Sequence, residues 1–227
     1  MAYYVKELCD FLTELSRNND RAWFKVRKDR YDALRKLWLD DLGLMIGAMA
    51  EWDSSLASVE PRKAAYRIYR DTRFSPDKTP YKTFFSAAIN PPSAGRDGAG
   101  YYLQIGPDFN RWTGLFAGIW CPEASVLKRL RRDIVDNIEE WEEILAVPEV
   151  ARNFEITCSD SLKTVPKGYD RNHPLARWLR MKDYGLEATV DPKFFFDPSW
   201  PEKSAELLSY TKPFVDFLNY SINESDD

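Results

Sequence analysis

The chain has 227 residues, of which 44% are apolar, 30% charged and 15% aromatic, and its formal net charge is −4. This composition excludes a disordered, collagen-like or coiled-coil protein, because it offers enough apolar surface to offset the entropy lost on ordering. It also excludes a membrane-spanning protein, since charged residues interrupt every run that approaches the roughly 20 apolar residues needed to cross a bilayer.

The first fifty residues predict two helices. Apolar residues lie three and four apart in the first, which places them on one helical face: Val5, Leu8, Leu12 and Leu15. A break with an N-cap at residues 18–20 separates it from the second. The apolar stripe of the second helix comprises Phe24, Tyr31, Leu34, Trp38, Leu42, Met45 and Met49. We expect that helix to bend or to end early at Gly43 or Gly47.

After Pro61 the pattern becomes typical of short strands, rich in aromatic or β-branched residues and bounded by Pro, Gly or Asp. The predicted strands are residues 65–69, 84–90, 101–106 and 114–120. A connection with hairpin composition, residues 91–100, lies between the second and the third. Four consecutive strands without an intervening helix favour an antiparallel sheet.

Helix returns in the second half of the chain. One helix is predicted from Pro122, with an apolar stripe that runs to Trp141. Two further strands, 154–158 and 184–190, flank a short helix at 175–181. A closing helix is predicted from Pro201 to about Ile222, with a kink at Pro213.

These elements predict an α+β fold. We expect one domain over residues 1–222, with an N-terminal helical layer, an antiparallel sheet of about five or six strands and helices covering one face of the sheet. Residues 223–227 are expected to form an acidic disordered tail. No signal-peptide pattern opens the chain, and the three cysteines, Cys9, Cys121 and Cys158, form no CxxC pair, so we expect a cytoplasmic protein with reduced thiols.

Charge is unevenly distributed along this acidic chain. Residues 62–82 contain seven basic and two acidic residues, and residues 163–182 contain six basic residues and one acidic residue. Such a protein is not expected to bind nucleic acid indiscriminately, but it could hold one anion in one place.

The densest group of candidate residues lies in the first of these basic segments. Its ligand-binding candidates are Arg67, Arg70, Arg73, Lys78, Tyr81 and Lys82. Guanidinium groups suit carboxylate and phosphate, ammonium groups act as point charges, and the tyrosine adds a ring and a hydroxyl. Asp71 and Asp77 could orient these cations or act as general bases. Alternatively, the charges form an ion-pair lattice that pins a long loop.

Residues 69–82, YRDTRFSPDKTPYK, resemble the RDxRFSxDKxPYK signature of a widespread bacterial and fungal family of conserved hypothetical proteins of unknown function. Segments that resemble other parts of this family are residues 18–24, 100–105, 118–123, 166–169, 173–174 and 179–180. The likeness covers nearly the full length. It implies an α+β domain, and it implies no activity, substrate or cofactor.

Two further residues are weighed for chemistry. His173, the only histidine, could act as an acid–base group, although such a residue more often caps a helix. If the second basic segment packs beside the first, His173, Tyr169 and Arg180 would join one pocket with Arg70 and Lys78. Cys121 precedes a helix and could pair with His173 as a nucleophile, but a buried inert thiol is the favoured interpretation.

The sequence contains none of the known motifs for metal sites or phosphate-binding loops. One histidine, no cysteine pair and no HExxH or calcium-loop spacing give no metal site, and the glycines of the 91–100 connection lack the features of a phosphate-binding loop. We therefore expect no metal and no cofactor. Aromatic and basic residues alternate between Tyr66 and Phe85, but the acidic net charge and the expected burial of most of these rings make nucleic acid unfavoured.

Three hypotheses follow for the function. The first is binding of a small anionic ligand, phosphorylated or carboxylated, at the basic loop of residues 67–82. The second is an enzyme that uses the same pocket, with Asp71, Asp77 or His173 as the acid–base group. The third is a structural or partner-binding protein in which the loop motif is an ion-pair brace.

Overall fold

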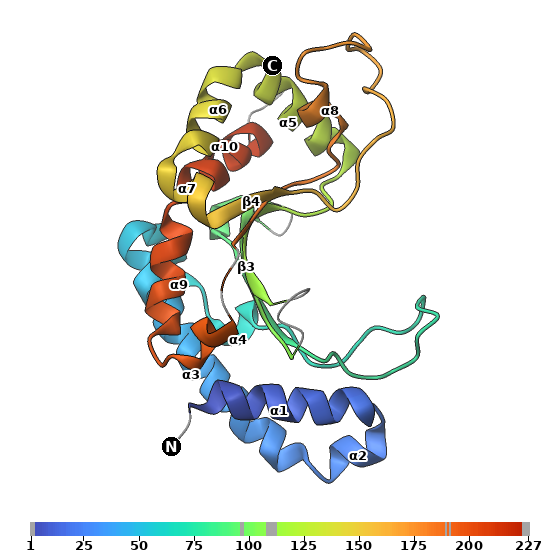
Figure 1. Cartoon of the computed structure of the whole chain (residues 1–227), viewed down its shortest axis with the longest axis vertical. Helices are drawn as coiled ribbons and strands as arrows, with labels where there is room; N and C mark the ends of the chain where they lie inside the picture. The colour runs from blue at the N-terminus through green and yellow to red at the C-terminus, as the bar shows by residue number, and fades with distance from the viewer. Residues whose placement is uncertain (1–2, 96–97, 108–112, 189, 191, 224–227) are drawn as a thin grey trace. The chain divides into compact units, whose positions relative to one another are not determined.

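The computed structural model describes residues 3–95, 98–107, 113–188, 190 and 192–223 (Figure 1). The chain divides into two compact units. The first comprises Met1–Ile89, Tyr102–Leu115 and Val190–Glu206, and the second comprises Asn90–Tyr101, Phe116–Thr189 and Leu207–Asp227. Each unit is thus assembled from segments that are distant in the sequence.

Helices account for most of the regular structure. The α-helices are α1 (Tyr4–Arg17), α2 (Arg21–Lys25), α3 (Lys28–Trp52), α4 (Pro61–Ala64), α5 (Ala124–Asp136), α6 (Ile138–Ala146), α7 (Pro148–Asn153), α8 (Ala176–Arg180), α9 (Trp200–Ser209) and α10 (Lys212–Asn223). The 3₁₀ helices are η1 (Ser54–Ser58), η2 (Pro92–Ala94) and η3 (Pro192–Phe196). Within the described part of the chain, none of the helices combines the length and apolarity needed to cross a membrane.

Five strands form one antiparallel sheet, which confirms the predicted α+β class. The strands are β1 (Phe85–Ile89), β2 (Gly100–Ile105), β3 (Gly114–Ile119), β4 (Phe154–Thr157) and β5 (Tyr184–Ala188), in the order β1-β2-β3-β5-β4. In the β4–β5 pair, Phe154 lies opposite Ala188 and Thr157 opposite Gly185. Gly118 in β3 has φ +138°, and a Cβ there would lie 2.1 Å from the carbonyl oxygen of Tyr184, so this close approach requires glycine.

The first unit is built around α1 and α3, which pack against each other through their apolar faces. Leu8, Leu12 and Leu15 of α1 are fully buried, as the spacing of the sequence predicts. The carboxylate of Asp41 in α3 is also buried, and it accepts hydrogen bonds from the Tyr3 hydroxyl and, at 3.2 Å, from the indole Nε1 of Trp200 in α9. Burial of a charge with two donors fixes these helices to one another.

The second unit has a core of aromatic rings. Trp141 of α6 is fully buried and contacts rings from α8, β5 and α10. These rings are Trp178, Tyr184, Phe214 and Phe217, at centroid distances of 5.2–5.8 Å. The helical periodicity that ends at Trp141 therefore marks the centre of this core.

Three helix predictions need correction. The second predicted helix is divided into α2, which contains Phe24, and α3. α3 runs through Gly43 and Gly47 to Trp52, because its buried stripe outweighs the roughly 1 kcal/mol that each glycine costs a helix. The helix predicted from Pro122 begins at Ala124 and is divided at Asn137 into α5 and α6.

The closing helix is divided as well. α9 ends at Ser209 and α10 begins at Lys212, so Pro213 lies in the first turn of a new helix rather than at a kink. The extent of the predicted domain, residues 1–222, stays a prediction. Of the predicted tail, Asn223 belongs to α10 and residues 224–227 lie outside the described residues.

Candidate functional site

The basic segment forms an extended arm, defined here as residues 66–84, between α4 and β1 in the first unit (Figure 1, turquoise). Its two sides run antiparallel: the Lys82 amide donates to the Ile68 carbonyl at 2.7 Å, and the Arg70 amide donates to the Pro80 carbonyl at 2.9 Å. The strand predicted at 65–69 is wrong, because only isolated bridges occur, at Ala65 and Tyr69. Ala65 and Tyr69 are four positions apart, whereas their partners Ala87 and Tyr81 are six apart, so the two sides lose register between the bridges and no continuous ladder forms. On the tip side of the Tyr69 bridge, Pro80 has no N–H to return a bond to Arg70.

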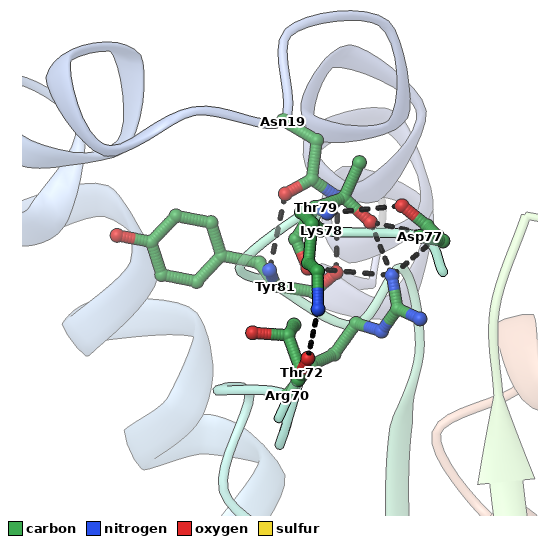
Figure 2. Close-up of polar contacts among 7 residues, drawn as sticks. All are labelled: Asn19, Arg70, Thr72, Asp77, Lys78, Thr79 and Tyr81. Carbon is green, nitrogen blue, oxygen red and sulfur yellow. Dashed lines mark hydrogen bonds and ion pairs between the residues drawn. The ribbon is translucent and has the colours of Figure 1, made fainter. Parts of the chain in front are cut away.

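The base of the arm is held by α2, through Phe24, and by the turn before it, through Asn19 (Asn19 in Figure 2). The side-chain amide of Asn19 donates to the Tyr81 carbonyl at 2.9 Å and accepts from the Tyr81 amide at 3.1 Å. The Tyr81 ring is buried and stacks on Phe24, with centroids 4.1 Å apart and an interplanar angle of 18°. Burial also raises the pKa of the Tyr81 hydroxyl. Two segments that resemble parts of one family, residues 18–24 and 69–82, therefore meet in space.

The tip of the arm, residues 70–80, is held by its own side chains. The Arg70 guanidinium donates to the Asp77 carboxylate and to the Thr79 hydroxyl, and it reaches the Thr79 carbonyl at 3.3 Å (Figure 2). Asp77 accepts in turn from the Thr79 amide at 2.9 Å and from the Thr79 hydroxyl at 3.0 Å. This group of three side chains closes the loop on itself.

Two more cations of the tip are also engaged. Arg73 forms a forked ion pair with Asp71, with Nη2 2.7 Å and Nε 3.0 Å from carboxylate oxygens. The ammonium group of Lys78 donates to the Thr72 carbonyl at 2.9 Å. Phe74, by contrast, is 93% exposed.

The pKa values of the two arm carboxyls follow from these bonds. The Arg73 guanidinium lowers the pKa of Asp71 to about 2, with a smaller contribution from Arg67. The Thr79 amide, followed by Arg70, lowers the pKa of Asp77 to about 2. Carboxylates held so strongly in the ionised form are weak general bases at neutral pH, so this arrangement does not support them as catalytic groups.

Arg67 and Lys82 differ from the other cations of the arm. The Lys82 side chain is half-buried, and its Nζ lies 4.8 Å from the Tyr66 ring centroid and 5.8 Å from that of Phe84. Burial holds the pKa of Lys82 below its usual value, and the nearby charge of Arg67 lowers it further. Neither cation forms an ion pair with a carboxylate among the residues that the structure describes. The arm thus has two neighbouring cations without an ion-paired carboxylate, although the charge of Asp71 also acts on Arg67.

The second basic segment belongs to the second unit, so its predicted convergence with the arm stays a prediction. Within that unit, Nδ1 of His173 accepts a hydrogen bond from the Leu175 amide at 3.1 Å, next to the start of α8. The imidazole also meets the edge of the Tyr169 ring. Both contacts fit a structural role for this histidine, although the bond goes to the N-cap residue Leu175 itself and α8 has no side-chain cap.

Cys121 is exposed, so the prediction of a buried thiol is wrong. Its backbone has φ +47°, the one positive φ among the described non-glycine residues, and it directly follows Trp120, which is 72% exposed. Cys121 lies in the connection between β3 and α5 rather than within either element, so its side chain belongs to no buried face of a helix or strand.

Two arrangements in the structure have no signal in the sequence. Asn19 lies 62 residues from Tyr81, and only the resemblance, which includes residues 18–24, pointed to its segment. In the second unit, Glu155 and Glu187 lie directly opposite each other on β4 and β5. Burial and the charge of Glu155 raise the pKa of Glu187. No periodicity or spacing connects either pair in the sequence.

Comparison with known proteins identifies the family and nothing more specific. Searches of curated proteins and of solved structures found no match to the chain. The family model DUF2461, described as a conserved hypothetical protein, matches residues 7–217, a range that includes the arm, its base and both basic segments. The chain therefore belongs to the DUF2461 family of conserved hypothetical proteins.

Proposed function

We propose that the arm binds a small anionic ligand, phosphorylated or carboxylated, through Arg67 and Lys82. The observation that carries this proposal is a half-buried ammonium next to a guanidinium, with no carboxylate paired to either among the described residues. Two like charges repel, and a desolvated ammonium is costly, so an anion bound between them would relieve both penalties.

The remaining cations of the motif have a different role in this proposal. Arg70 and Arg73 are already paired with Asp77 and Asp71, and Lys78 binds a backbone carbonyl. These groups would keep the tip of the arm in one conformation. We infer that the third hypothesis describes the tip and the first hypothesis describes the Arg67–Lys82 pair.

The enzyme hypothesis gains no specific support. Asp71 and Asp77 have lowered pKa values, and Nδ1 of His173 is used in a backbone hydrogen bond. We further infer a cytoplasmic location, because the three cysteines are free thiols.

Thermal unfolding in phosphate tests the proposal. A ligand that binds the folded state with a dissociation constant of about 1 mM stabilises it by about 1.8 kcal/mol at about 20 mM, which raises the Tm of a chain this size by about 4–7 °C. Sodium chloride at matched ionic strength controls for general salt effects. We expect this rise for the wild type and its loss in Lys82→Met and Arg67→Met.

The matched control is Lys36→Met, which removes an exposed ammonium from α3 and should keep the full response to phosphate. Lys82→Met should fold at least as well as the wild type, because it removes a partly desolvated charge. An equal phosphate response in the wild type and both arm variants would overturn the proposal.

A further inference from the structure

We propose that the ligand of the arm carries a flat ring next to its anionic group, and that Tyr66 binds this ring. The inference rests on the proposed function, since it places the anion at Arg67 and Lys82. Tyr66 directly precedes Arg67, its ring lies against the Lys82 ammonium, and the residue is 51% exposed. A cation pair and an open aromatic surface are therefore adjacent.

A second ring supports the position of Tyr66. The Tyr102 ring of β2 lies 6.3 Å from the Tyr66 ring at an interplanar angle of 57°. The Tyr102 hydroxyl donates to Gln104 Oε1 at 2.7 Å, and Gln104 is buried. A ring that is fixed by a buried hydrogen-bond partner limits the positions open to its neighbour. The exposed surface of Tyr66 is thus held in place by the sheet.

The other exposed rings of the arm lack an open charge beside them. Phe74 is the most exposed, but its neighbouring cation, Arg73, lies 5.7 Å from the ring and is paired with Asp71. Tyr69 packs on Phe24 and Tyr81 at the base of the arm. Among the described residues of the arm, the combination of open cation and open ring therefore occurs at Tyr66.

The ligand chemistry follows from this adjacency. An aryl phosphate or aryl carboxylate joins ring and anion directly, so that the anion can meet Arg67 and Lys82 while the ring covers the exposed part of Tyr66. Aromatic pairs contribute about 0.5–1.5 kcal/mol beyond the area they bury, which corresponds to an affinity about two- to tenfold higher than that of a ringless anion of the same charge.

Calorimetric titration of the full chain with two phosphate monoesters tests the inference. Methyl phosphate supplies the anion alone, and phenyl phosphate supplies the same anion with a ring. We expect phenyl phosphate to bind about two- to tenfold more tightly to the wild type. Tyr66→Ser should abolish this preference, so that both esters bind it equally, whereas Lys82→Met should weaken both ligands.

Phe74→Ser is the matched control, because it removes an exposed ring from the same arm, and it should keep the preference for phenyl phosphate. Equal binding of both esters by the wild type, or a preference that survives in Tyr66→Ser, would overturn the inference while leaving the proposed function intact. Failure of both esters to bind would contradict the proposed function itself.

Discussion

The base and the tip of the arm carry adjacent parts of one motif, but buried packing and backbone hydrogen bonds hold the base, whereas exposed ion pairs hold the tip. At the base, Tyr81 is 5% exposed, stacked on Phe24 and bonded at both backbone groups by Asn19. At the tip, the Arg70–Asp77 pair has side chains 27% and 56% exposed, so water screens its attraction.

This difference separates global stability from local order. Buried rings and buried backbone partners contribute to the free energy of unfolding of the whole unit, whereas exposed ion pairs mainly select one conformation of a loop. A dense run of charges in a sequence therefore indicates that a loop is ordered, but it does not indicate that the loop adds to the free energy of unfolding.

The largest effect is expected from Phe24→Ala. Phe24 is 3% exposed and contacts the rings of Phe11, Tyr31, Tyr69 and Tyr81, so its truncation should lower the free energy of unfolding by about 3–5 kcal/mol in urea denaturation. Val26→Ala is the control: this neighbouring side chain is 77% exposed and should change stability by less than about 0.5 kcal/mol. Similar losses in the two variants would show that the base is not a packed core.

Asn19→Ala should have an intermediate effect. It leaves the amide and carbonyl of Tyr81 without partners, at a cost of about 1–3 kcal/mol, and it should speed hydrogen exchange of the Tyr81 amide. Asn18→Ala removes an exposed side chain that donates to the Glu14 carbonyl rather than to Tyr81, so it should leave that exchange rate unchanged. An unchanged Tyr81 exchange rate in Asn19→Ala would mean that the clamp does not hold the arm.

Arg70→Ala should hardly change the free energy of unfolding, because the pair it breaks is exposed on the Asp77 side. It should instead release the tip, so that trypsin cleaves faster after Arg73 and Lys78 in limited proteolysis. Arg62→Ala removes an exposed cation just before the arm and should leave cleavage of the tip unchanged. Equal cleavage of the Arg70→Ala and wild-type tips would argue against the brace.

The smallest effect is expected at low pH, where protonation of Asp77 should break its bond to the Thr79 amide at the tip. The pKa of Asp77 is lowered to about 2, so the bond from the Thr79 amide is present above the pKa of an unfolded aspartate and is lost as the pH falls through about 2. The Thr79 amide resonance should follow this titration. A midpoint near pH 4 would indicate an unpaired carboxylate and a disordered tip.

The sequence predicts the elements better than their partners. The apolar spacing of Leu8, Leu12 and Leu15 is enough to place a helix and its buried face. The strand predicted at 65–69 fails although its aromatic composition suits a strand, because its bridge partners Ala87 and Tyr81 lie six positions apart while Ala65 and Tyr69 lie four apart. The composition of a segment indicates which secondary structure that segment favours, but strand pairing also depends on the segment that lies opposite it.

The same limit applies to the candidate site. Charge density locates the arm but does not distinguish its five cations, because the sequence does not show that Asp77 binds Arg70 while Lys82 lies against rings. The clamp from Asn19 is equally hidden, since nothing in the spacing links it to Tyr81. These distinctions come from tertiary contacts alone.

The central claim is that Arg70, Arg73 and Lys78 are engaged by groups of the arm itself, whereas Arg67 and Lys82 are open to a ligand. Calorimetric titration of phosphate into Arg73→Ala and Lys82→Met, side by side with the wild type, tests it most directly. We expect Arg73→Ala to keep binding, with at most a small loss from the Asp71 charge that it leaves unpaired near Arg67, and Lys82→Met to lose binding. The reverse result, with binding lost in Arg73→Ala and kept in Lys82→Met, would contradict the division.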